Sequence, residues 1–226
     1  FTGTLADAKE NTASGEQTAI ADFSELTEAG TYKVVTENYG ESFEFEIGEG
    51  IYDKVMDSAM RMFYLQRCGS VLEDETFGHD AFHTGGWHDA GDYGRYTVAG
   101  AKAAADLLLA YENYGEQFGD DTGIPESGNG IPDILDEVKY ELDWMLLMQD
   151  PESGGVYHKI TCENFPDSVM PEEETEQVSL APVSTTATAD FAAVMAMAAR
   201  VYQDIDADYQ KTCLAAAEQA WSYLEA

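Results

Sequence analysis

The chain of 226 residues is long enough for one large domain or for a small domain followed by a larger one, and its 44% hydrophobic content provides for a sizeable core. Its 44 acidic and 11 basic residues give a formal net charge of −33, and such a surface repels phosphate backbones and anionic lipid. The composition therefore argues against nucleic-acid and membrane partners. It favours a neutral or cationic ligand and offers many weak sites for calcium.

The three cysteines are widely spaced, and their odd, low number predicts no disulfide framework. The cysteines do not decide whether the protein is secreted or intracellular, because a secreted protein can do without disulfides. No run of about 18 apolar residues occurs, so we expect no transmembrane helix. Since the sequence starts at Phe1 rather than at a methionine, we expect it to be processed or truncated.

Residues 1–48 have the composition of a β module. Segments 31–36 and 42–47 are rich in β-branched and aromatic residues, and a turn-like stretch at 38–40 separates them, which predicts a hairpin. Residues 19–23 are a candidate third strand. Because three strands make a poor core on their own, we interpret this region as part of a β-sandwich. A hairpin attached to the larger domain is the alternative.

Residues 49–226 are mainly helical. Apolar residues recur at spacings of three and four, which predicts amphipathic helices. The predicted helices cover residues 51–64, 98–114, 131–148, 183–202 and 209–224. Residues 150–182 lack clear periodicity, and a loop of this length inside a compact domain is usually functional. We expect a helical barrel or toroid whose loops gather at one end.

The most unusual stretch is residues 85–96 (GGWHDAGDYGRY), directly before one predicted helix. It holds Asp89 and Asp92 among glycines, which allow a sharp turn or a close approach to a ligand. The two carboxylates either cap the following helix or hold and deprotonate a water molecule that attacks a glycosidic carbon. The neighbouring aromatic rings favour the second interpretation, because aromatics stack on sugar rings and carboxylates move protons.

The same stretch resembles the signature of glycoside hydrolase family 9, the inverting cellulases and endoglucanases. Further matches follow in the family's order and extend the resemblance over residues 49–226. They are FYLQRCG (63–69), GNGIPDILDE (128–137), GGVYHK (154–159), MPEEE (170–174) and VSTTATAD (183–190). Residues 4–47 resemble the later part of the immunoglobulin-like module that precedes the catalytic domain in one branch of the family.

The resemblance implies a mainly α fold, in which part of an (α/α)6 barrel (residues 49–226) follows a partial immunoglobulin-like β module (residues 1–48). It implies a secreted enzyme that hydrolyses β-1,4-glucosidic bonds in cellulose or related β-glucans with inversion. It implies no cofactor for the chemistry itself. In the family's motif, Asp92 corresponds to the general base and Asp89 to the residue that helps hold the attacking water. The ligand is then a β-glucan polysaccharide or oligosaccharide.

The family's general acid is a Glu in the last part of the barrel, and no glutamate of this chain matches that position. We therefore expect the acid outside this chain, which resembles the N-terminal half of the catalytic domain, and little or no catalysis by this chain alone. A second chain that carries the rest of the barrel is a possible partner. The alternatives are an inactive glucan-binding or scaffold fragment, and an (α/α)6 glycosidase that acts on another polysaccharide.

Relatives with the immunoglobulin-like module bind a structural zinc ion, and the resemblance maps its ligands to Cys68, His83 and His88. Phe82 stands where a further Cys is expected, and His79 is a candidate substitute. Four such donors within about 20 residues suit zinc. Calcium is a second candidate ion, and the acidic run at residues 172–174 is either a solvated loop or a calcium site.

Three further residues are candidates for binding the substrate. Trp87 and Tyr93 flank the two carboxylates, so we expect them to line a sugar cleft. His158 lies in the GGVYHK motif and either faces the cleft or is an ordinary loop histidine. Trp144 lies in the middle of a predicted helix and fits the core better, and Ser184 fits the N-cap of the helix that follows it.

Overall fold

The computed structural model describes residues 1–69, 71–72, 75–76, 84–166, 168–174 and 178–226. The chain divides into two compact units, Phe1–Met56 and Asp57–Ala226. The boundary predicted between residues 48 and 49 lies shortly before this division. Each unit is described by itself.

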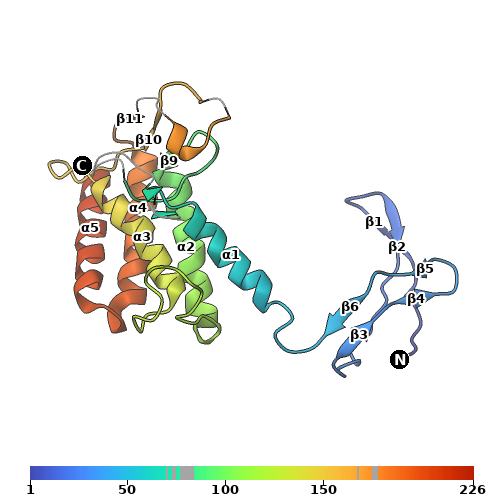
Figure 1. The fold of residues 1–226 in the computed structure, drawn as a ribbon. Helices are drawn as coiled ribbons and strands as arrows, with labels where there is room; N and C mark the ends of the chain where they lie inside the picture. The colour runs from blue at the N-terminus through green and yellow to red at the C-terminus, as the bar shows by residue number, and fades with distance from the viewer. Residues whose placement is uncertain (70, 73–74, 77–83, 167, 175–177) are drawn as a thin grey trace. The chain divides into compact units, whose positions relative to one another are not determined.

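The first unit consists of short antiparallel strand pairs (Figure 1). The pairs are β1 (Lys9–Asn11) with β2 (Glu16–Thr18), β3 (Gly30–Tyr32) with β6 (Phe45–Ile47), and β4 (Val35–Thr36) with β5 (Gly40–Glu41). The predicted hairpin is thus confirmed as two nested pairs, β3–β6 and β4–β5. The pair β1–β2 was not predicted, because its residues are polar and exposed and give no alternating apolar signal.

The predicted strand at residues 19–23 is wrong. These residues form no strand, although the N–H of Ala6 donates a hydrogen bond of 3.0 Å to the carbonyl of Ile20. Directly afterwards, the side chain of Asp22 accepts hydrogen bonds from the N–H and the hydroxyl of Ser24. Such a local side-chain turn competes with extended pairing and bends the chain.

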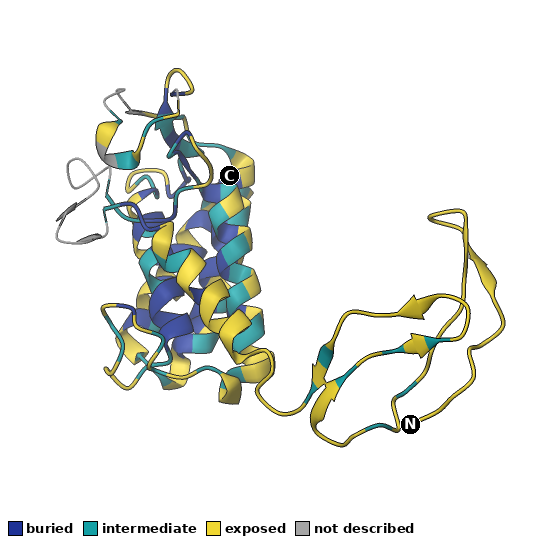
Figure 2. Cartoon of the chain, turned by 45° about the vertical axis from the view of Figure 1, so that its right-hand side comes forward, coloured by how far each residue is buried: buried dark blue, intermediate teal, exposed yellow. Residues whose placement is uncertain are grey.

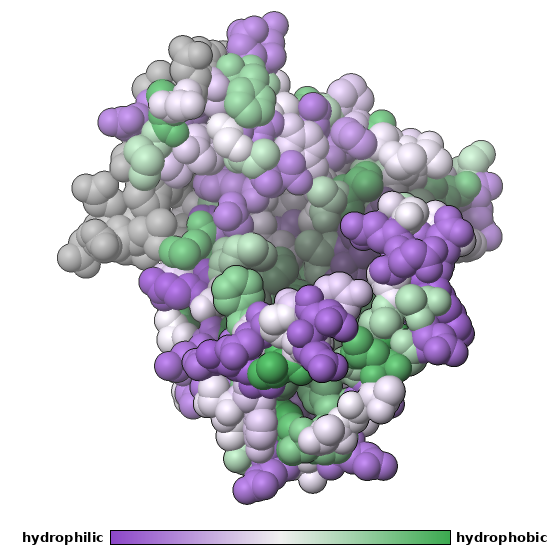
Figure 3. Space-filling model, turned by 90° about the vertical axis from the view of Figure 1, so that its right-hand side faces the viewer, coloured by the Kyte–Doolittle hydropathy of each residue, from purple (hydrophilic) through white to green (hydrophobic). Residues whose placement is uncertain are grey.

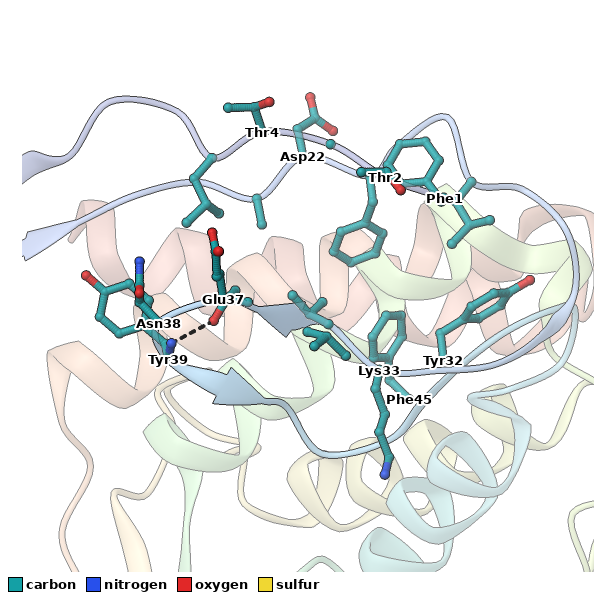
Figure 4. Close-up of a pocket in the computed structure, with 18 residues that line it drawn as sticks. Phe1, Thr2, Thr4, Asp22, Tyr32, Lys33, Glu37, Asn38, Tyr39 and Phe45 are labelled. Atoms are coloured by element: carbon teal, nitrogen blue, oxygen red, sulfur yellow. Dashed lines mark hydrogen bonds between the residues drawn. The ribbon is translucent and has the colours of Figure 1, made fainter.

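A pocket in this unit is partly lined by aromatic rings (Figure 4). The ring of Phe45 lies 5.4 Å from that of Phe23 and 6.3 Å from that of Tyr32. Most of the unit is nevertheless exposed (Figure 2). All residues that line the pocket lie between positions 1 and 45, so it contains none of the predicted site residues.

The second unit is built from helices that lie side by side (Figure 1). They are α1 (Asp53–Leu65, which begins in the first unit), α2 (Thr97–Tyr114), α3 (Asp133–Leu147), α4 (Thr185–Val201) and α5 (Ala207–Glu225), with short 3-10 turns η1 (Gly115–Gln117), η2 (Pro171–Glu173) and η3 (Tyr202–Asp204). All five predicted helices are confirmed, to within two residues at each end. Long apolar periodicity is the most dependable signal in a sequence.

The core lies between α2, α3, α4 and α5 (Figure 2). It combines large side chains such as Phe191, Leu142 and Trp144, each at most 1% exposed, with many alanines. The predicted core position of Trp144 is therefore confirmed. Small side chains let helices approach closely, and α4 and α5 pack extensively against each other along the alanine-rich faces.

A three-stranded antiparallel sheet lies at one end of the helices (Figure 1). Its central strand is β10 (Lys159–Cys162), flanked by β9 (Arg95–Tyr96) and β11 (Val178–Leu180). A separate pair joins β7 (Val71–Leu72) and β8 (Glu75–Thr76). The expectation of irregular structure throughout residues 150–182 is corrected here, because two strands are too short to give a periodic signal. The sheet joins this segment to the end of the 85–96 motif.

The surface is mixed in hydropathy. On the face that Figure 3 shows, hydrophilic side chains alternate with smaller hydrophobic patches. Among the described residues, no helix is both long enough and apolar enough to span a lipid bilayer.

The start of α5 offers a test of the fold. The carboxylate of Asp206 caps this helix by accepting the N–H groups of Asp208 (3.2 Å) and Tyr209 (2.9 Å). We expect Asp206→Ala to lower the free energy of unfolding by about 1 kcal/mol, because the cap is lost. Urea unfolding monitored by circular dichroism measures this change. The control Asp208→Ala removes an exposed first-turn charge and its ion pair with Lys211 but no capping bond, and an equal loss in both variants would contradict the role of the cap.

Candidate active site

Asp89 and Asp92 lie on one tight turn between α1 and α2. The N–H of Asp89 donates to the carbonyl of Gly94 (2.9 Å), and the N–H of Tyr93 donates to the carbonyl of Ala90 (3.1 Å). Tyr93 has a φ of 51°, the one left-handed non-glycine conformation among the described residues. A bulky residue is held in this region only when its surroundings enforce it, and such strain concentrates at functional sites.

Asp92 is 7% exposed, and its carboxylate accepts hydrogen bonds from three groups. Its Oδ1 accepts the N–H of Gly94 (3.1 Å). Its Oδ2 accepts the hydroxyl of Tyr96 (2.5 Å) and that of Thr161 (3.3 Å). Asp89, in contrast, is exposed on the same turn.

The alternative interpretation of the two carboxylates as a helix cap is wrong. The N-cap residue of α2 is Tyr96, and it makes no side-chain capping bond. The carboxylate of Asp92 accepts its hydrogen bonds from the turn, from β9 and from β10, so these bonds orient the carboxylate and do not cap the helix. The predicted cap of α4 is confirmed, because the hydroxyl of Ser184 accepts the N–H of Ala187 (3.2 Å).

Gly94 is required by the crowding around Asp92. A Cβ atom at this position would lie 2.7 Å from the ring of Tyr96, 2.8 Å from Oγ1 of Thr161 and 3.0 Å from Oδ2 of Asp92. The glycine therefore lets the backbone approach these three side chains closely.

The structure places the three predicted substrate-binding residues as follows. Trp87 is 7% exposed, its ring lies 5.1 Å from that of Phe63, and it borders a small pocket together with Asp89 and Tyr96. Tyr93 is half-buried and donates its hydroxyl to the carbonyl of Val169 (2.5 Å).

The third predicted substrate-binding residue, His158, is also half-buried. Its Nδ1 lies 3.0 Å from Oγ of Ser184. Sugar binding by Trp87, Tyr93 and His158 stays a prediction.

Two buried glutamates of α3 hold the beginning of the motif. Glu141 is 1% exposed, and its Oε2 accepts the N–H of Trp87 (2.6 Å). Glu137 is fully buried; its Oε1 accepts the indole N–H of Trp87 (2.8 Å) and the Nε–H of Arg67 (3.0 Å). Buried carboxylates are stable only when they are hydrogen-bonded or neutral. This pair therefore fixes Trp87, two residues before Asp89.

A cation holds the other end of the motif. Arg95 is buried and donates from Nη1 to the carbonyl of Gly85 (2.7 Å), while its guanidinium lies 5.6 Å from the ring centre of Trp144. Burial lowers the pKa of Arg95. Arg95 thus joins the two ends of the turn, and β9 joins Arg95 to β10.

Sequence reasoning missed Thr161, Glu137 and Glu141 as parts of the site. For the two glutamates the sequence does carry a signal. They are four residues apart on a helix, so they lie on the same face, and the neighbouring positions of that face hold core residues. Both glutamates therefore face the interior. Thr161 gives no comparable signal, because only the pairing of β9 with β10 brings it to Asp92.

Only part of the predicted zinc site falls within the described residues. His79, Phe82 and His83 lie outside them. Cys68 is buried, and burial raises the pKa of its thiol. His88 is half-buried, and burial together with the charge of Arg95 lowers its pKa to about 4, so the imidazole is neutral at pH 7. A neutral imidazole is the form that binds metals.

Three carboxylates near the start of α3 are suited to a hard cation. Asp120, Asp133 and Asp136 each offer an oxygen, and these atoms lie within 4.8 Å of one another. Asp133 is fully buried, and its Oδ1 accepts no hydrogen bond from the described residues. Burial raises the pKa of Asp136, and the neighbouring carboxylates add to this effect. Calcium binds through such oxygen clusters, so the donor set fits it.

Comparison with known proteins identifies the class. The glycosyl hydrolase family 9 domain matches residues 52–226, and the cellulase N-terminal ig-like domain matches residues 1–41. The chain therefore belongs to glycosyl hydrolase family 9. The predicted fold class, part of an (α/α)6 barrel after a fragment of an immunoglobulin-like module, is confirmed.

Several curated relatives are similar to this chain. Endoglucanase D of Acetivibrio thermocellus is 37% identical over 100% of the chain and 40% of its own length. A cellodextrinase of Butyrivibrio fibrisolvens is 44% identical over 89% of the chain and 42% of its own length. A xyloglucan-specific endo-beta-1,4-glucanase of Bacteroides ovatus is 35% identical over 90% of the chain and 40% of its own length.

Solved structures agree with these relatives. A metagenome-derived glycoside hydrolase family 9 endoglucanase superimposes with a TM-score of 0.88 at 41% identity, over 99% of this chain and 45% of its own. AaCel9A, solved in complex with cellobiose-like isofagomine, gives a TM-score of 0.85 at 35% identity, over 100% of this chain and 45% of its own. The chain thus spans less than half the length of these proteins.

The buried Glu141 predicts a pH dependence of stability. Burial raises its pKa from 4.5 to about 8 in the folded protein. The folded state therefore holds a proton that the unfolded state releases, and this group lowers stability progressively as the pH rises from about 4.5 to about 8. We expect the melting temperature of Glu141→Gln to rise relative to the wild type over this range, because glutamine does not ionise.

Differential scanning calorimetry at pH 5, 6.5 and 8 measures this difference. The control Glu218→Gln removes one acidic group from an exposed position of α5. A Glu141→Gln difference that stays constant with pH, or that matches the control, would show that Glu141 is ionised in the folded protein.

Proposed function

We propose that this chain is the water-activating part of a β-1,4-glucan hydrolase that acts with inversion. Asp92 is the general base, Asp89 helps hold the attacking water, and the general acid is a Glu outside this chain. Membership of family 9 and the endoglucanase relatives support the reaction class. The AaCel9A complex with cellobiose-like isofagomine supports a β-linked glucan as ligand.

The observation that carries this proposal is the environment of Asp92. Three hydrogen-bond donors orient its carboxylate, while Asp89 is exposed on the same turn, so one carboxylate is fixed and the other is open to water. In an inverting enzyme a base deprotonates water on one face of the sugar while an acid, roughly 6.5–9.5 Å away, protonates the leaving oxygen. The two aspartates supply the first half of this reaction.

One other function is a candidate. A glycosidase of the same fold with another polysaccharide preference is favoured by the xyloglucan-specific relative. Activity of the full-length protein on carboxymethylcellulose, xyloglucan and xylan separates these possibilities.

The substitution Asp92→Asn tests the assignment of the base. In the full-length protein we expect kcat on carboxymethylcellulose to fall by roughly 10²–10⁴-fold, because general base catalysis is lost. Reducing-sugar release at saturating substrate measures this loss. The control Asp121→Asn changes an exposed aspartate outside the motif and should leave kcat unchanged. Wild-type kcat in a correctly folded Asp92→Asn variant would exclude Asp92 as the base.

We also propose that Asp120, Asp133 and Asp136 bind a calcium ion with a structural role. The close carboxylates and the unsatisfied Oδ1 of Asp133 support this proposal. Added calcium should raise the melting temperature of the wild type by a few degrees, because a ligand that binds only the folded state stabilises it. Asp133→Asn should lose most of this increase, and Asp121→Asn should keep it. No response of the wild type to calcium, or an equal response in Asp133→Asn, would exclude the site.

Three finer expectations remain proposals. Zinc binding by Cys68, His83 and His88 is tested by the zinc content of the purified wild type against Cys68→Ser. Secretion accords with a polymeric substrate outside the cell. The remainder of the barrel is supplied by further polypeptide, because the relatives are more than twice as long as this chain.

A further inference from the structure

We infer that Tyr96 is a positioning residue for the base, and that it directs the proton of the attacking water to Oδ1 of Asp92. This inference rests on the proposed function, because it requires Asp92 to be the base. It goes beyond that function by assigning a role to Tyr96 and by distinguishing the two oxygens of one carboxylate.

The hydrogen bonds of Asp92 are distributed unequally between its oxygens. An ionised carboxylate has about two acceptor positions on each oxygen. Oδ2 uses both, for the hydroxyls of Tyr96 (2.5 Å) and Thr161 (3.3 Å). Oδ1 uses one, for the N–H of Gly94 (3.1 Å). Oδ1 therefore keeps an acceptor position for a proton from water.

The position of Tyr96 is fixed by the sheet rather than by the turn alone. Strand β9 pairs with β10 so that Tyr96 lies opposite Lys159, two residues before Thr161, and the ammonium of Lys159 lies 5.0 Å from the centre of the Tyr96 ring. Both hydroxyl donors to Oδ2 thus come from neighbouring strands of one sheet. Gly94 leaves room for this cluster, since a Cβ atom there would contact all three side chains.

The chemistry of a phenol suits this task. A hydrogen bond from a neutral hydroxyl to a carboxylate is short and strong. Burial raises the pKa of Tyr96, and the hydrogen bond to Asp92 raises it further, so the phenol keeps its proton at neutral pH and remains a donor. This hydrogen bond holds the carboxylate of Asp92 in one orientation without taking the proton of the water. The proton moves from water to Oδ1 as the oxygen of that water forms its bond to the anomeric carbon. The glycosidic C–O bond breaks in the same step, and the general acid outside this chain protonates the leaving oxygen.

A double-mutant cycle in the full-length protein tests this inference. We expect Tyr96→Phe to lower kcat on a soluble cello-oligosaccharide roughly 10-fold or more with KM unchanged, because a hydrogen bond to a charged group is lost. In an Asp92→Asn background the same substitution should lower kcat less than 2-fold, since coupled residues do not act additively. Thr161→Val should have a smaller effect of the same kind, because its hydrogen bond is longer. The control Tyr114→Phe, at the exposed end of α2, should have none.

Each outcome supports or overturns the inference. Unchanged kcat in Tyr96→Phe, a change confined to KM, or an equal loss in the Asp92→Asn background would overturn it. If Tyr96→Phe does not fold, Thr161→Val and its combination with Asp92→Asn make the same comparison. The proposed function fails separately, when Asp92→Asn alone keeps the wild-type kcat.

Discussion

The hydrogen bonding of one buried carboxylate is the constraint on which the arrangement of this site depends. An ionised carboxylate away from water must find donors, or its burial becomes too costly. Asp92 meets this requirement with donors from three places: its own turn, strand β9 and strand β10. Segments almost 70 residues apart in the sequence are thereby joined at one oxygen atom. The glycine at position 94 and the left-handed backbone of Tyr93 are consequences of fitting this cluster into a tight turn.

A second layer of buried polar side chains supports the same turn. Glu137 and Glu141 reach from α3 to both N–H groups of Trp87, and Arg95 reaches back to Gly85. Burying these groups costs more free energy than burying apolar side chains would. The contacts therefore fix the position of the turn and add little to the free energy of unfolding. The close approach of Gly100, where a Cβ atom would lie 2.1 Å from Oε1 of Glu141, shows how tightly α2 and α3 enclose this carboxylate.

Some features of this structure could be predicted from the sequence, and others could not. The five helices were predictable because each repeats its apolar pattern over three or more turns. The aspartates of the motif were predictable because glycines and aromatic residues around paired carboxylates are unusual for a plain helix cap. The hydrogen-bond partners of Asp92 were not predictable. Thr161 reaches Asp92 only through the pairing of the two-residue strand β9 with the four-residue strand β10. Strands of this length give no periodic signal. Tyr96 was visible as an aromatic residue of the motif, but its donation to Asp92 depends on a backbone path that only the fold defines.

The central claim is that Asp89 and Asp92 deliver a water molecule, rather than attack the sugar themselves. Proton NMR of a cello-oligosaccharide during the first minutes of hydrolysis by the full-length protein tests it most directly. If water is activated on the face opposite the leaving group, the newly formed reducing end appears first as the α-anomer and then equilibrates. First appearance of the β-anomer would mean retention through a covalent intermediate, and it would contradict the roles assigned to both aspartates.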